Sequence, residues 1–86
     1  MTMMTAEQVA TLIRDGLPGA TVQVRSQDNV HFEALVVSPE FAGRRPLQRH
    51  QRVYQTLGAL MGSDEIHALA LTTLTPDELA AQQGRG

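Results

Sequence analysis

The strongest constraint on the fold is a helical segment that lies between two strand-like segments. Residues 46–61 begin with Pro46, a residue favoured at the first position of a helix, and carry apolar side chains at spacings of three and four. Residues 31–38 and 66–73 are apolar runs typical of buried strands. Because neighbouring strands joined by a helical crossover run parallel, these segments predict one parallel strand pair.

A second strand pair is predicted upstream. Residues 5–16 start with a capping-box sequence and end in glycine, which predicts a helix of about eleven residues. From Thr21 the apolar period changes to two, as in a half-buried strand. A short link through Asp28 and Asn29 then leads into residues 31–38, so these two strands are expected to form an antiparallel hairpin.

Two proline-containing signals complete the order of elements. Residues 38–43 begin with Ser-Pro and end in glycine, which predicts one turn of helix. Thr75, Pro76 and Glu78 form a strong start for a last helix, with Thr75 at the N-cap and Glu78 at the third helical position. The predicted order is helix, strand, strand, short helix, helix, strand, helix.

This order predicts an α+β fold with two layers, a three-stranded mixed sheet with helices on one face. At 86 residues the chain is expected to form a single domain over 1–86, with an ordered core over about 5–79 and a frayed tail at 82–86. The hydrophobic fraction of 42% and charged fraction of 19% are those of a folded globular protein.

Composition also excludes several functions. No window approaches the roughly 18 consecutive apolar residues of a membrane span, and no signal peptide is recognised, so we expect a cytoplasmic protein with no membrane association. Cysteine is absent, which excludes disulfides and protein-supplied thiolates. The net charge of −2 argues against a generally basic nucleic-acid coat but allows a local basic patch.

Such a patch is predicted on the helix over residues 46–61. Its apolar face is expected to carry Leu47, His50, Tyr54, Leu57 and Met61. An exposed cationic stripe is expected on another side. Three interpretations of that stripe stay open: a solvated face, a surface for an acidic partner, or a contact for phosphates. The four arginines of this region are Arg44, Arg45, Arg49 and Arg52.

The histidines are the other candidates for chemistry. His67 is expected on one strand face with Leu69 and Leu71, and His31 at a strand entrance, and each is either a hydrogen-bonded structural residue or a ligand. His50 is assigned to packing. The three aromatic side chains are expected in the core: Phe32, Phe41 and Tyr54.

Catalysis is disfavoured. The chain contains no glycine-rich phosphate loop, no His-Glu-x-x-His zinc motif and no Ser-His-Asp arrangement that its spacing supports. The acidic pair Asp64 and Glu65 next to His67 is more typical of a polar turn than of an acid-base site. We therefore expect a binding protein and not an enzyme.

Four segments together resemble the BolA family. They are a Val-Ser-x-x-Phe-x-Gly segment within 37–43, an Arg-His-x-x-Val-Tyr helix at 49–54, an Ile-His-Ala-Leu strand at 66–69, and a Thr-Pro-x-Glu ending at 75–78. The resemblance covers about residues 5–79, and the combination is specific although each motif alone is weak. It implies a fold similar to class II KH domains.

The resemblance also implies a function. BolA-like proteins are partners of monothiol glutaredoxins, with which they share a 2Fe-2S cluster. Glutaredoxin and its glutathione supply the thiolates, and the BolA-like chain supplies a strand histidine and a ligand from the first hairpin. Matched onto this sequence, the strand ligand is His67, and the hairpin ligand is His31, since Val30 stands where related chains can carry cysteine.

The alternative implied by the resemblance is a DNA-binding transcriptional regulator that uses the basic helix at residues 44–52. The chain lacks the Gly-x-x-Gly loop with which KH domains hold single strands, so contacts with duplex phosphates are the form this alternative takes. Leu79 stands where family members often carry tryptophan, and the sequence leaves open whether the free protein forms a homodimer.

Overall fold

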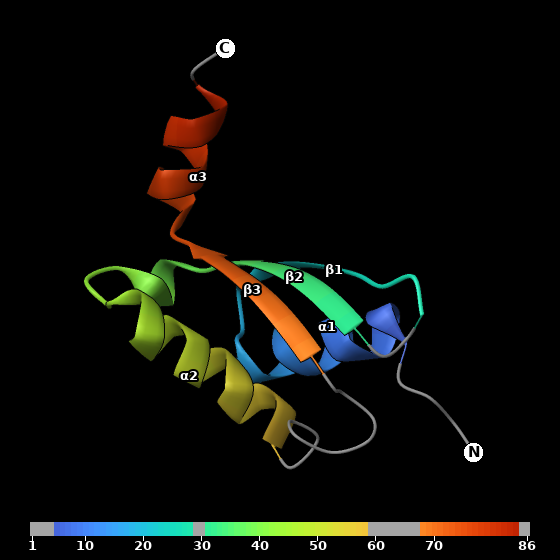
Figure 1. Ribbon diagram of the computed structural model, residues 1–86. Coiled ribbons are helices and arrows are strands. Elements are labelled where there is room, and N and C mark those ends of the chain that lie inside the picture. The colour runs from blue at the N-terminus through green and yellow to red at the C-terminus, as the bar shows by residue number, and fades with distance from the viewer. Residues whose placement is uncertain (1–4, 29–30, 59–67, 85–86) are drawn as a thin grey trace.

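The computed structural model describes residues 5–28, 31–58 and 68–84. Their element order confirms the prediction of an α+β fold with a three-stranded mixed sheet (Figure 1). The elements are α1 (Ala6–Gly16), β1 (Thr21–Arg25), β2 (His31–Val37), the 3-10 turn η1 (Pro39–Phe41), α2 (Pro46–Leu57), β3 (Ala68–Leu74) and α3 (Pro76–Gln83).

The sheet has the order β1-β2-β3. Strands β1 and β2 are antiparallel, with Thr21 opposite Val37, as expected for a hairpin. Strands β2 and β3 are parallel, with His31 opposite Ala68, as expected for a helical crossover. This register brings the start of β2 beside the start of β3.

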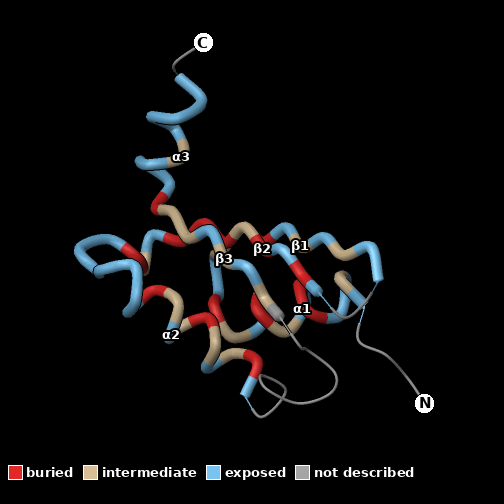
Figure 2. Tube along the Cα trace, viewed as in Figure 1, coloured by how far each residue is buried: buried red, intermediate tan, exposed pale blue. Residues whose placement is uncertain are grey.

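One face of the sheet carries the core. Helices α1 and α2 cover this face, and the buried segments of the chain gather between them and the strands (Figures 1 and 2). The first part of strand β2 alternates, with Phe32 and Ala34 buried and His31 and Glu33 exposed. Phe41 of η1 is also buried, so both phenylalanines lie in the core as predicted, whereas Tyr54 is only partly buried.

The predicted apolar face of α2 is confirmed at Leu57 and wrong at Leu47. The buried residues of α2 are Arg49, Val53 and Leu57, spaced by four, while Leu47 is 68% exposed. The helix ends at Leu57 because Gly58 adopts a φ of 57°, and its N–H donates to the carbonyl of Tyr54. The predicted continuation to Met61 and Gly62 falls outside the described residues.

Helix α3 leaves the end of β3 and projects away from the sheet (Figure 1). Its predicted start is confirmed: Thr75 Oγ1 accepts from the Glu78 N–H at 3.1 Å, and Glu78 Oε1 accepts from the Thr75 N–H at 2.8 Å. None of its residues is buried, so α3 does not join the layer formed by α1 and α2. Within the described ranges, no helix has the length and apolar content that crossing a membrane requires.

Candidate functional site

His31 stands at the start of β2, where the hairpin link ends. Its ring Nδ1 lies 2.9 Å from Asp28 Oδ2, and its backbone N–H donates to Asp28 Oδ1 at 2.9 Å. Ser26 Oγ donates to the His31 carbonyl at 2.6 Å. The side chain is nevertheless 69% exposed, and its Nε2 makes no hydrogen bond within the described residues. The hairpin therefore holds the imidazole by one nitrogen and leaves the other available.

An open hollow of about 880 Å³ adjoins this histidine. Its lining comes from three parts of the fold: the start of α1 at Ala6, the hairpin around Asp28 and His31, and Ala70 of β3. Both polar and apolar side chains line it, Val24 and Phe32 among them, and a group bound at His31 would have space between the hairpin and the third strand.

The other predicted ligand, His67, lies outside the described residues. Ala68, which follows it in the sequence, is the register partner of His31. The described residues contain no group of three or more metal-ligating side chains, and the chain has no cysteine. Any thiolate ligand at His31 would therefore come from another molecule.

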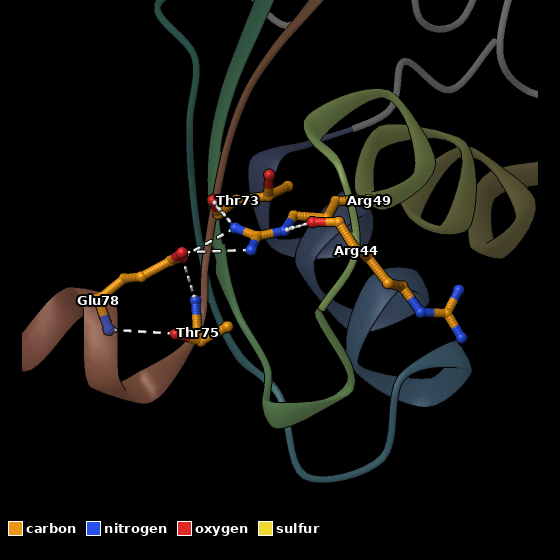
Figure 3. A network of polar contacts seen from close by, with 5 residues as sticks. All are labelled: Arg44, Arg49, Thr73, Thr75 and Glu78. Carbon is orange, nitrogen blue, oxygen red and sulfur yellow. Dashed lines mark hydrogen bonds and ion pairs between the residues drawn. The ribbon is translucent and has the colours of Figure 1, made fainter. Parts of the chain in front are cut away.

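The prediction of an exposed cationic stripe is wrong for Arg49, which is 9% exposed and lies in the network of polar contacts drawn in Figure 3. Its Nε donates to the Arg44 carbonyl at 3.0 Å, and its Nη1 donates to the Thr73 carbonyl at 3.2 Å. Nη1 and Nη2 pair with the two carboxylate oxygens of Glu78 at 2.8 and 3.2 Å. A buried guanidinium needs such partners, so Arg49 ties the start of α2 to β3 and α3.

The contact with Arg49 changes the pKa of Glu78. The Arg49 guanidinium, followed by the backbone N–H of Thr75, holds the pKa of the Glu78 carboxyl below its usual value of 4.5. The carboxylate therefore stays ionised in both of its roles, as the partner of Arg49 and as part of the cap of α3.

Arg52 is likewise engaged inside the fold. Its Nε donates to Glu40 Oε1 at 2.7 Å, and its Nη2 donates to the Gly16 carbonyl at 2.9 Å. Arg44 and Arg45 are exposed and form no ion pair among the described residues. The structure therefore presents two of the four predicted arginines to solvent and uses the other two as internal ties.

Sequence reasoning missed Asp28 as part of the candidate site. The signal was present, because an aspartate three residues before the first residue of a strand can accept from that residue's backbone N–H across a turn. It also missed the acidic partners Glu40 and Glu78. They lie 12 and 29 residues from their arginines along the chain, and no local pattern indicates either pairing.

Comparison with known proteins gives consistent matches. The family described as "BolA-like protein" matches residues 13–78. An uncharacterized protein from the rpoN-murA intergenic region of Acinetobacter guillouiae is 33% identical over 75 residues, covering 87% of this chain and 89% of that protein. A Haemophilus influenzae protein named "DNA-binding transcriptional regulator BolA" is 48% identical over 52 residues, which cover 60% of this chain and only 50% of that protein.

A solved structure agrees with these sequence matches. The BolA protein homologue from Coxiella burnetii superposes with a TM-score of 0.75 at 46% identity, over 90% of this chain and 97% of that one. The sequence motifs, the element order, the family match and this superposition all lead to one assignment: the chain belongs to the BolA family.

Proposed function

We propose that this chain is an adaptor that binds a monothiol glutaredoxin and shares a 2Fe-2S cluster with it, serving iron-sulfur trafficking or iron regulation. The register of the parallel strands carries the proposal, because His31 is paired with Ala68, the residue that follows His67. Neighbouring strands lie about 4.8 Å apart, so His31 stands beside Ala68, to which His67 is covalently joined. The proposal is that the imidazoles of His31 and His67 bind the same small cluster.

The chemistry of the donors supports the same proposal. Histidine replaces cysteine on one iron in some 2Fe-2S proteins and raises the potential of the cluster. Because the chain contains no cysteine, the thiolates come from the glutaredoxin and its glutathione. The chain's own residues then bind and orient the cluster, and no catalytic step is assigned to them.

The test is to reconstitute a cluster on a monothiol glutaredoxin, add this protein, and record visible absorption and circular dichroism. His67→Ala and His31→Ala should each change the spectrum of the mixed complex. His50→Ala is the matched control, because His50 is a partly buried histidine on α2 that does not line the hollow beside His31. A spectrum for His67→Ala identical to that of the unsubstituted protein would refute the ligand assignment.

A second function is supported by a relative's name. The Haemophilus influenzae protein is named a DNA-binding transcriptional regulator, although the match spans half of its length. For this chain we propose that exposed Arg44 and Arg45 at the start of α2 contact duplex phosphates. Arg49 and Arg52 serve this function less well than the sequence predicted, since Glu78 and Glu40 already neutralise them.

Titration of duplex DNA at several salt concentrations tests this second function. Removing two phosphate contacts in Arg44→Ala/Arg45→Ala should weaken binding and reduce the slope of log affinity against log salt by about 1.8. Arg14→Ala, which removes an exposed arginine from α1, is the control. Equal affinity and equal slope in the double variant and the unsubstituted protein would exclude this surface.

A further inference from the structure

We infer that Asp28 is a positioning residue that selects the tautomer of His31 and so presents Nε2 as the donor atom. The inference rests on the proposed ligand role of His31 and goes beyond it by assigning a function to a residue that contacts no iron. It starts from the two contacts between these residues, each 2.9 Å long.

The two carboxylate oxygens of Asp28 have different partners. Oδ1 accepts the backbone N–H of His31, which fixes the carboxylate relative to the main chain. Oδ2 faces the ring Nδ1. An ionised carboxylate only accepts hydrogen bonds, so the proton of a neutral imidazole must sit on Nδ1. The lone pair is then on Nε2, the nitrogen that makes no hydrogen bond within the described part of the chain.

The hairpin also limits the movement of the ring. The carbonyl of His31 accepts from Ser26 Oγ at 2.6 Å, so the N–H, the carbonyl and the ring of this residue are all held by the same short link. A metal-bound histidine commonly donates its other N–H to a carboxylate, which fixes the ring and raises its basicity, and loss of that partner lowers metal affinity about 10–100-fold. Asp28 has the geometry of such a partner.

Asp28→Asn separates this role from a role in shaping the turn. The asparagine keeps an oxygen for the His31 N–H and suits the same turn. Its NH₂ replaces the oxygen that faces Nδ1, so the favoured tautomer becomes the one protonated on Nε2, which has no lone pair there for iron. Asp15→Asn, an identical change at an exposed position of α1, is the matched control.

The first measurement uses the protein alone. Nitrogen-15 NMR of the imidazoles, at a mildly alkaline pH where histidine is neutral, should show His31 protonated on Nδ1 in the unsubstituted protein and in Asp15→Asn. In Asp28→Asn the proton should move to Nε2. The same tautomer in all three proteins would overturn the inference, whatever the glutaredoxin complex does.

The second measurement uses the reconstituted complex with glutaredoxin. Asp28→Asn should hold the cluster at least about tenfold more weakly than Asp15→Asn in a competition with a chelator. If His31→Ala still weakens the complex, equal retention of the cluster by Asp28→Asn and Asp15→Asn would overturn the inference. An unchanged spectrum for both His31→Ala and His67→Ala would instead refute the proposed function, so the two failures are distinguishable.

Discussion

Replacing Arg49 with methionine should destabilise the fold more than any other single arginine change among the described residues. The guanidinium joins three parts of the chain that are distant in sequence, through the Arg44 carbonyl, the Thr73 carbonyl and the Glu78 carboxylate. The central carbon of the guanidinium, Cζ, also lies 5.9 Å from the centroid of the Phe41 ring. Methionine keeps the apolar length of the side chain and removes every one of these polar contacts.

The magnitude follows from the burial of the two partners. The Arg49 side chain is 11% exposed, so its hydrogen bonds to the two carbonyls are shielded from water, and such bonds to a charged group contribute about 1.5–3 kcal/mol each. The Glu78 side chain is 45% exposed, so its loss of a partner is largely compensated by water and adds little. Allowing for partial rehydration of the carbonyls, we expect Arg49→Met to lower the free energy of unfolding by about 2–4 kcal/mol.

Equilibrium unfolding in urea, followed by circular dichroism, measures this change. For a chain of this size the melting temperature should fall by at least about 8 °C. Arg45→Met, which removes an exposed arginine from the same helix start, should change stability by less than about 0.5 kcal/mol. A loss below about 1 kcal/mol in Arg49→Met, or equal losses in the two variants, would refute the structural role assigned to Arg49.

Three further predictions concern stability. The pKa of Glu78 is lowered in the fold, so the native protein should have a higher free energy of unfolding than Glu78→Gln, by the full amount above the usual carboxyl pKa of 4.5. This difference should shrink as the pH falls through the lowered pKa. Urea midpoints of the two proteins that differ equally at every pH would contradict this prediction. In Gly16→Ala the new Cβ would lie 2.6 Å from Thr56 Cγ2, so the variant should unfold about 1–3 kcal/mol more easily, and Thr56→Ser should recover part of the loss. Phe41→Ala should cost about 3–5 kcal/mol, and a melting temperature equal to that of the unsubstituted protein would contradict its place in the core.

Local patterns in the sequence were sufficient for the order of elements. The capping boxes at Thr5 and Thr75 and the proline at position 46 predict where the three helices begin, and the structure confirms each start. The period-two pattern from Thr21 predicts the first strand. These signals are local, because a cap or an alternating strand involves residues only a few positions apart.

The buried face of α2 depended on tertiary contacts. A helix with Leu47, His50, Tyr54 and Leu57 predicted on its buried face predicts that the arginines between them are exposed, and for Arg49 this is wrong. Arg49 is buried because Thr73 and Glu78, from β3 and α3, provide acceptors for it. Burial of a charge is stable only where such partners converge, and the convergence arises from the packing of the whole chain.

For the candidate site, too, some features are determined by the sequence and others only by the tertiary structure. Histidines at positions 31 and 67 and the absence of cysteine are readable from the sequence, and they predict imidazole donors that need a thiol-bearing partner. The pairing of His31 with Ala68 was decided only by the parallel register of β2 and β3, and the contact of Asp28 with the His31 ring only by the folded hairpin. Residue types specify which atoms can donate, whereas strand register and turn geometry determine which of those atoms meet.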